Sequence, residues 1–488
     1  MPFVTGSSCR IHSSPPLLRM LVMIVTCATA VGAEDSIEPR LRLRDTVHQA
    51  TGTPIRQGVF RVYENRAAAS GRVLELDIVV FPAIEQPAKP DPVFFVAGGP
   101  GQNATAFVDG WARHWVRQAR DIVLLSQRGT SGGNRLQCGL PGSDDDIQGY
   151  FEPAFDADAF RECLKQLRQR ADLRMYSTPI AMDDLNDVRR ALGYQKINLF
   201  GGSYGSRAEL VYLRRHPETV RCAVLNSVAP LAFRNPLYHA EGAQHALDRV
   251  FERCEAHEDC REVFGDLRKK FDTVMKRLSK QRAKATVRHP RTGEKVDVRI
   301  SRDAFADGLR VYMYVNYQDV PRIIFEAYEG DFDLFAEAGL QRARGLRHGL
   351  AFGMLACVTC AEDVARIDPD EIEKHTRGTF LGDGRVRRQM EICKFWPKSD
   401  LPDDYGEPVR ADVPVLLLSG ELDSVTPPKW GAEAARNLGN ATHVIAPGSH
   451  GVAGPCIDSI VRAFLEQPDR KPDTSCVDRM RLSGFRAP

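Results

Sequence analysis

A serine flanked by glycines follows a short apolar run, and this arrangement limits the folds that are open to the chain. Residues 201–205 read Gly-Gly-Ser-Tyr-Gly, with Ser203 at the centre. The run 196–200 before them is typical of a strand, and 206–215 after them is typical of a helix. A sharp turn between strand and helix crowds the backbone, and glycines leave room for it. The sequence therefore predicts a strand, a tight turn that exposes the Ser203 hydroxyl, and a helix.

The segments on either side of this turn alternate between strands and helices. Apolar and polar residues alternate over 74–80, which is the period of a half-buried strand. Apolar residues recur at helical spacing over 182–192, and Gly193 is suited to end that helix. This succession predicts a mostly parallel sheet with helices on its faces. Short continuous strand-like runs occur at 93–97, 122–125, 196–200, 220–225, 413–418 and 443–446.

The middle of the chain has a different character. Apolar residues share a helical face over 247–254 and again over 264–278, and a hairpin is predicted over 286–300. We interpret this region as a mainly helical cap inserted into the α/β core. The predicted organisation is a signal peptide over 1–33, a core over 34–230, a cap over 231–407, and the last core strands with the C-terminal tail over 408–488.

The first 33 residues are typical of a secretory signal. Arg10 and Arg19 precede the apolar run 20–26, and small residues before Glu34 offer a cleavage site. The run is short for a membrane span, so an uncleaved anchor is the weaker alternative. No later segment reaches 18 uninterrupted apolar residues. We therefore expect an exported protein, periplasmic or extracellular, without stable membrane insertion.

The net charge argues against polyanionic partners. The chain carries 66 Lys and Arg against 64 Asp and Glu, a formal charge of +2. Removal of 1–33, with two arginines and no carboxylates, leaves 64 against 64, or 0. A neutral chain has no global electrostatic reason to bind nucleic acid. The basic stretch 268–291 places its cations between apolar helix positions, which favours a solvated helix face.

Ten of the twelve cysteines lie after the predicted signal. An even number in an exported chain favours disulfides over metal or redox use. Cys254 and Cys260 are close enough in sequence to pair locally, and Cys456 with Cys476 would hold the C-terminal tail. Cys222 lies in an apolar run and is expected to be a buried thiol.

A serine nucleophile requires a base, and that base requires a carboxylate to orient it. In α/β-hydrolases these follow in the order Ser, Asp or Glu, His. His450 lies in a turn after the last strand-like run, where such folds place their sites, and is the predicted base. His443 lies inside that run and is expected to be packed. Asp423, in the loop after 413–418, is the predicted acid, with Glu421 as its rival.

The oxyanion of an acyl-transfer reaction requires preorganised donors, commonly two backbone N–H groups. Tyr204 follows the nucleophile and is predicted to supply one of them. The loop 98–102 reads Gly-Gly-Pro-Gly-Gln, and Gly99 is the predicted second donor because Pro100 has no N–H. No Lys-Ser or Lys-Thr pair follows these glycines, so a phosphate-binding loop is not expected. The predicted chemistry needs no metal or cofactor.

These segments resemble proline iminopeptidases, and most closely the exported, cysteine-bearing relatives that remove amino acids or short peptides from N-termini. The resemblance implies a capped α/β-hydrolase. Ala97 stands where many members have His, and Ser126 stands where an acid often occurs. The segments that carry the resemblance are 97–101, 127–129, 202–205 and the late pair Asp423 and His450.

The same resemblance implies further contacts. Segments around Cys360 and Cys393 are similar to those of the exported relatives and imply a disulfide between these two residues, with another between Cys138 and Cys163. In this family a cap carboxylate receives the free ammonium of the substrate, and Glu362 matches its segment. A solvated acid at a helix terminus is the alternative for Glu362.

The sequence thus predicts a serine aminopeptidase that acts on peptides with free N-termini. A carboxylesterase on the same machinery is the nearest alternative, because fold and triad do not define the leaving group. A non-catalytic binding module is the alternative from another class. The retention of Ser203, Asp423 and His450 argues against it.

Overall fold

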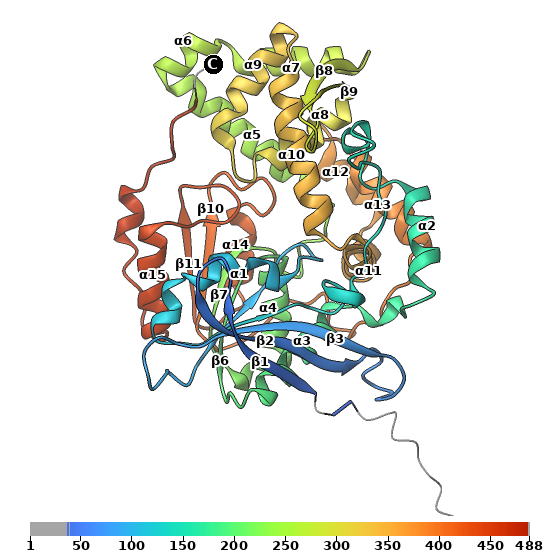
Figure 1. Ribbon diagram of the computed structural model, residues 1–488. Helices are drawn as coiled ribbons and strands as arrows, with labels where there is room; N and C mark the ends of the chain where they lie inside the picture. Colours follow the sequence, from blue (N-terminus) through green and yellow to red (C-terminus); the bar gives the residue numbers. More distant parts are fainter. Residues whose placement is uncertain (1–36, 39, 487–488) are drawn as a thin grey trace, which may run out of the picture. The chain divides into compact units, whose positions relative to one another are not determined.

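The computed structural model describes residues 37–38 and 40–486 (Figure 1), so the predicted signal peptide lies outside the described residues. Its main element is a nine-stranded sheet. The apolar runs of the sequence form its central strands because they are covered on both faces. The strands are β1 (Leu41–His48), β2 (Thr53–Tyr63), β3 (Val73–Phe81), β4 (Val93–Val96), β5 (Ile122–Leu125), β6 (Ile197–Ser203), β7 (Val220–Val228), β10 (Val415–Gly420) and β11 (Ala441–Ala446).

The strands are ordered β1-β2-β3-β5-β4-β6-β7-β10-β11. β1, β2 and β3 form an antiparallel meander, and β3 pairs antiparallel with β5. Every later neighbour pair, from β5 to β11, is parallel. Parallel neighbours need crossovers, and helices supply them on both faces. This confirms the α/β-hydrolase fold that the sequence predicts.

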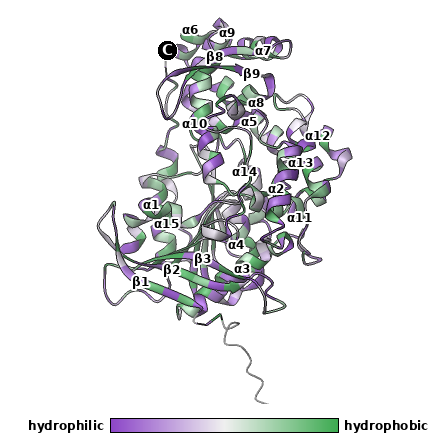
Figure 2. Cartoon of the chain, turned by 45° about the vertical axis from the view of Figure 1, so that its right-hand side comes forward, coloured by the Kyte–Doolittle hydropathy of each residue, from purple (hydrophilic) through white to green (hydrophobic). Residues whose placement is uncertain are grey.

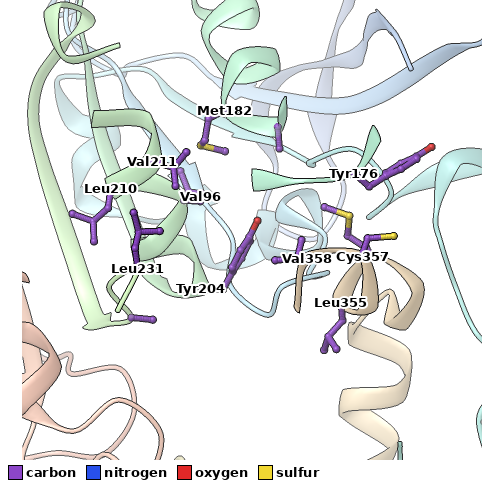
Figure 3. Packing of buried hydrophobic residues seen from close by; sticks show 14 of the residues in the cluster. Val96, Tyr176, Met182, Tyr204, Leu210, Val211, Leu231, Leu355, Cys357 and Val358 are labelled. Carbon is purple, nitrogen blue, oxygen red and sulfur yellow. The ribbon is translucent and has the colours of Figure 1, made fainter. Parts of the chain in front are cut away.

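Two apolar layers cover the faces of the sheet. On one face Leu199 and Val211 belong to a cluster that also includes Met182 and Leu355, and Figure 3 shows part of it. On the other face Leu124 and residues of the C-terminal helix form a second cluster. The core helices are α1 (Val108–Ala112), α2 (Ala157–Leu167), α3 (Thr178–Ala191), α4 (Tyr204–Arg215), α14 (Pro428–Ala435) and α15 (Pro455–Glu466).

The segment between β7 and β10, called the cap from here on, is mainly helical. Figure 1 shows its helices α5 to α10 gathered at the top with the hairpin, while α11 and α13 lie beside α2. The cap has an apolar cluster of its own. Its elements are α5 (His239–Ala256), α6 (Glu258–Phe264), α7 (Leu267–Leu278), β8 (Ala283–Arg288), β9 (Lys295–Ile300), α8 (Arg302–Tyr312), α9 (Val320–Glu329), α10 (Asp333–Gly349), α11 (Phe352–Glu362), α12 (Ile372–Thr376) and α13 (Gly384–Phe395).

One predicted element of the cap is wrong in its extent. The sequence predicts a single helical face over 264–278, but Phe264 ends α6 and a separate helix, α7, begins at Leu267. Gly265 has φ +62°, which ends the first helix, and the Asp266 side chain caps the second by accepting from the Lys269 N–H at 2.9 Å. Both helices keep their apolar residues toward the cap interior, so hydrophilic and hydrophobic residues alternate along them (Figure 2).

All four predicted disulfides are present. They join Cys138 to Cys163, Cys254 to Cys260, Cys360 to Cys393 and Cys456 to Cys476. Cys222 and Cys357 are buried free thiols. Such a disulfide content is typical of proteins in oxidising environments. Within 37–38 and 40–486, no helix has both the length and the apolarity that crossing a bilayer requires.

The Cys360–Cys393 disulfide ties α11 to α13 and closes a loop of 33 residues. Loop-closure entropy predicts that the Cys360→Ser/Cys393→Ser variant loses about 3–4 kcal/mol of unfolding free energy. Urea unfolding monitored by circular dichroism measures this loss. Cys357→Ala, which removes a neighbouring thiol without a disulfide, is the matched control and should lose clearly less. Equal losses in the two variants would contradict the prediction.

Candidate functional site

The turn at Ser203 is strained and has room only for glycine two residues before and two residues after the serine. Ser203 ends β6 with φ +57° and ψ −127°, a conformation that residues other than glycine rarely adopt. A Cβ atom on Gly201 would lie 2.8 Å from the Val96 carbonyl oxygen and would collide with Glu209. A Cβ atom on Gly205 would collide with the same Val96 carbonyl. The Gly-x-Ser-x-Gly pattern therefore has a steric cause here, which is the close approach of β4 and α4 to the turn.

The glycine-rich loop 98–102 lies beside this serine. A Cβ atom on Gly98 would be 3.5 Å from the Ser203 Cβ atom. Gly99 has φ +111°, and within the described chain its N–H donates no hydrogen bond. The loop is fixed to the N-terminus of α11, because the Ala351 N–H donates to the Gly101 carbonyl at 2.9 Å. The Gly99 N–H is thus a donor without an acceptor in the part of the chain that the structure describes.

Tyr204 is the first residue of α4, where backbone N–H groups lack partners inside the helix. The positive end of the helix dipole lies there as well, which favours negative charge. Its side chain is buried in the core, as Figure 3 shows, and its hydroxyl lies 2.8 Å from the Thr178 hydroxyl. Core packing and this hydrogen bond hold Tyr204 rigidly next to Ser203.

Asp423 and His450 contact each other in the loops that follow β10 and β11. The His450 Nδ1 lies 2.9 Å and 3.0 Å from the two carboxylate oxygens of Asp423. Asp423 is fully buried and accepts from the N–H groups of Val425 and Thr426, each at 2.8 Å, and from the Thr426 hydroxyl. Burial alone would raise its pKa, but His450 and these backbone donors together lower it, so the carboxylate stays ionised.

The rival residues lie elsewhere. Glu421 is partly exposed, and within the described residues its carboxylate has no contact with His450. His443 lies on β11, where its Nε2 is 2.9 Å from the Ser419 hydroxyl and its ring packs against Gly431. The structure therefore brings Asp423, and not Glu421, to His450.

Ser203 and His450 line one cavity of about 390 Å³. Because Nδ1 of His450 is bound to Asp423, its Nε2 is the ring nitrogen left for the cavity. Core and cap both contribute to the walls, which are largely aromatic and aliphatic. Apolar members include Phe155, Phe233, Tyr314, Phe335, Leu346 and Phe352.

The cap also places charged side chains on the cavity wall, and the sequence-based prediction missed them. They are Asp303, Asp307 and Arg310 on α8, Arg342 and Arg347 on α10, and Arg385 and Arg388 on α13. The three residues of α8 follow one another at helical spacing and so share a face. This spacing was the only signal in the sequence that could have identified them. It does not distinguish residues on a cavity wall from residues on an exposed helix face, because both show it.

Glu362 does not lie on the cavity wall. It is fully buried at the C-terminus of α11, where Oε1 accepts from the Thr178 N–H at 2.6 Å. Its other oxygen accepts from the hydroxyls of Thr178, at 2.7 Å, and Tyr405. Burial raises its pKa against the effect of these hydrogen bonds. These contacts do not fit the predicted role. A carboxylate that receives a substrate ammonium needs an oxygen that faces the substrate, whereas both oxygens of Glu362 accept from protein donors.

Glu362 instead joins Tyr204, through Thr178, to the segment that carries Tyr405. We expect Glu362→Gln to lower the free energy of unfolding by about 1–3 kcal/mol, because an amide cannot accept from all of these donors. Thermal unfolding measures this change. The ratio of cleavage rates for free and N-acetylated peptides should stay unchanged, and a fall of that ratio would restore Glu362 as the ammonium site.

Comparisons with known proteins show which families this chain resembles. A family model described as TAP-like protein matches residues 379–476. The serine protease Hip1 of Mycobacterium tuberculosis is 22% identical over 432 residues, which cover 81% of this chain and 82% of that protein. The proline iminopeptidase of Neisseria gonorrhoeae is 27% identical over 146 residues, 30% of this chain and 35% of that one.

Among solved structures, the proline iminopeptidase of Mycobacterium smegmatis matches with a TM-score of 0.42 and 14% identity. That match covers 84% of this chain and 99% of the other. The strand order, the strained serine turn and these sequence similarities agree. The chain is an α/β-hydrolase of the serine hydrolase type, and it is similar in sequence to a serine protease, to proline iminopeptidases and, over residues 379–476, to the family described as TAP-like protein.

Proposed function

We propose that this protein is a serine aminopeptidase that removes single residues or short peptides from the N-termini of peptides. The observation that carries the proposal is that a strained, glycine-flanked serine and a carboxylate-bound histidine line the same cavity. A buried acid, an imidazole and an exposed hydroxyl are the parts that acyl transfer by serine requires.

In the proposed reaction the Ser203 Oγ attacks the carbonyl carbon of the scissile bond. His450 Nε2 accepts the hydroxyl proton and then donates it to the leaving amine. Asp423, already ionised and bound to Nδ1, holds the imidazole in the correct tautomer and stabilises its cationic form. Water then attacks the acyl-enzyme by the same proton transfers in reverse, which releases the acyl product and restores Ser203.

Negative charge develops on the carbonyl oxygen as the tetrahedral intermediate forms. The Tyr204 N–H, at the N-terminus of α4, and the Gly99 N–H, in the adjacent loop, are the proposed donors to this oxyanion. Neither residue has to move, because Tyr204 is held by Thr178 and the loop is held by Ala351. Preorganised donors of this kind stabilise the transition state without a cost of reorganisation.

The size of the cavity supports action at a chain end. About 390 Å³ lies near the lower limit of ligand pockets, and cap side chains form much of its wall. A cavity of this volume accommodates a few residues, which fits the removal of short pieces from a chain end. The similarity to proteins named proline iminopeptidase supports the amino end.

Asp307 is the cavity carboxylate that we propose to receive the substrate ammonium in place of Glu362. Its Oδ1 is buried and has no hydrogen-bond partner among the described residues. Its Oδ2 lies 3.6 Å from the Arg388 guanidinium. An ammonium group would supply the donor that Oδ1 lacks, and a charge-assisted hydrogen bond of this kind is strong in a partly dry site.

We also propose that the protein is exported. The four disulfides support this proposal, since they persist in oxidising compartments. The signal predicted over 1–33 would direct the export.

The triad roles are tested by two variants and mass analysis of products from an unblocked peptide. Ser203→Ala should abolish cleavage, and Asp423→Asn should lower kcat about 10⁴-fold because the imidazole loses its orienting charge. Glu421→Asn, in the same loop, is the matched control and should leave kcat unchanged. Short-chain esters are assayed in parallel. A preference for esters irrespective of a free amine would refute the peptidase assignment.

The ammonium site is tested with Asp307→Asn. We expect kcat/KM for peptides with a free N-terminus to fall about 10–100-fold, the loss that a charged hydrogen bond implies. Cleavage of N-acetylated peptides should remain at its low level. Asp272→Asn, which removes an exposed acid of α7, is the control. If Asp307→Asn and the control cleave free peptides equally well, Asp307 has no part in recognition.

A further inference from the structure

Among the described residues, four arginines line the catalytic cavity without an ion pair to a carboxylate. One of them, Arg342 on α10, is half-buried, and its Nη2 lies 3.1 Å from the side-chain amide of Asn316. The other three are Arg310 on α8, Arg347 on α10 and Arg385 on α13, so they reach the cavity from three different helices. The exposed fractions of Arg310 and Arg347 are only 2% and 9%. Within the described part of the chain, none of the three forms an ion pair within 4.0 Å. This is an unusual state for buried cations, which are almost always paired.

Their polar contacts leave donors unused. One Arg310 amino group donates to the Tyr314 hydroxyl at 2.5 Å, but its Nε has no partner among the described residues. Arg347 makes one long contact of 3.4 Å with the Gly149 carbonyl, and its Nη1 has no partner there either. The Arg385 Nε donates to the side-chain oxygen of Gln389 at 3.4 Å, and the guanidinium of Arg385 lies 5.1 Å from the centre of the Phe155 ring.

Two other arginines of the same cavity, Arg207 and Arg388, are paired with carboxylates. Arg207 donates to Asp363 at 2.6 Å, deep in the core. Arg388 lies 3.3 Å from Asp303 and 3.6 Å from Asp307. Only some of the cavity arginines therefore lack a carboxylate partner. This lack does not result from a general shortage of acids in the cap.

Acids compensate the positive charge of these arginines only in part, because Asp307 attracts Arg385 but forms no ion pair with it. Burial lowers the pKa of Arg347 to about 10. Burial and then repulsion by Arg310 lower the pKa of Arg385 to about 10 as well. Both groups still carry their charge at neutral pH, and apolar walls screen them poorly. Such an arrangement destabilises the free protein and is relieved when an anion binds.

We propose that Arg310, Arg347 and Arg385 form a subsite that binds a carboxylate of the substrate. The proposal rests on the peptidase function proposed above and makes the substrate class narrower: peptides with a carboxylate near the scissile bond. Guanidinium groups match carboxylates in shape and donate two parallel hydrogen bonds to them. The carboxylate belongs either to an acidic side chain or to the free C-terminus of a short peptide, and the experiment separates these two sources.

The test uses matched unblocked peptides that differ in a single carboxylate. Glu is replaced by Gln at each of the first three positions in turn, and the C-terminal carboxylate is replaced by an amide. We expect one of these changes to lower kcat/KM of the full-length enzyme at least about tenfold, the effect of losing a charged hydrogen bond. The sensitive position identifies the source of the carboxylate. Equal rates for all matched pairs would overturn the proposal.

Variants then connect this preference to the three arginines. Arg310→Gln, Arg347→Gln and Arg385→Gln should each reduce the preference, mainly through KM. Arg387→Gln, which removes an exposed arginine of α13 paired with Asp383, is the matched control and should retain it. The melting temperatures should not fall, because an unpaired cation is lost. Two outcomes would show that these arginines have only a structural role. One is that all three variants keep the preference for peptides with the carboxylate, and the other is that all three have lower melting temperatures with an unchanged KM.

Binding to the Ser203→Ala variant separates this proposal from the proposed function. Calorimetry with the same peptide pairs should show at least about tenfold weaker binding of the uncharged member. Labelling of the wild-type serine by a fluorophosphonate reports an active nucleophile independently of substrate charge. If Ser203 is labelled but no peptide is cleaved, the proposed peptidase function is wrong. The calorimetric comparison then still shows whether the three arginines bind a carboxylate. Equal binding of both members refutes the subsite alone.

Discussion

The crowded turn at Ser203 is the constraint on which the rest of the site depends. Neither Gly201 nor Gly205 has room for a Cβ atom, because the Val96 carbonyl approaches both. The backbone of Ser203 is therefore held at a positive φ, and its side chain projects away from the sheet toward the cavity. The energy of that strain is offset by the packing of β4, β6 and α4 around it.

The turn is supported by a buried polar network that reaches into the cap. The Tyr204 side chain bonds to Thr178, and Thr178 bonds to Glu362 at the end of α11. The loop that carries Gly99 is held at the other end of α11, through Ala351. Both proposed oxyanion donors thus depend on how one cap helix packs against the core. This arrangement explains why Glu362 is enclosed, although it lies in a segment that resembles a substrate-binding one.

The cap supplies most of the residues proposed for recognition, while the core supplies the proposed catalytic residues. Phenylalanine, tyrosine and leucine side chains lower the polarity of the cavity, so that the charges on α8, α10 and α13 act at short range. Asp307 shares α8 with Arg310, and Arg347 and Arg385 come from α10 and α13, so opposite charges lie on the wall of one cavity. A small peptide that carries an ammonium group and a carboxylate would match both.

The sequence by itself determined the features whose cause is local. The serine turn, the parallel strands and the positions of Asp423 and His450 in loops after strands follow from glycine sterics and from periodicity, which act over a few residues. Only the tertiary structure decided which cap residues face the cavity. Glu362 and Asp307 are both helical carboxylates in sequence, but packing encloses one among hydroxyl donors and leaves an oxygen of the other unpaired. Whether a side chain on a helix faces solvent, core or substrate depends on which helices pack beside it. A local sequence pattern does not specify those neighbours.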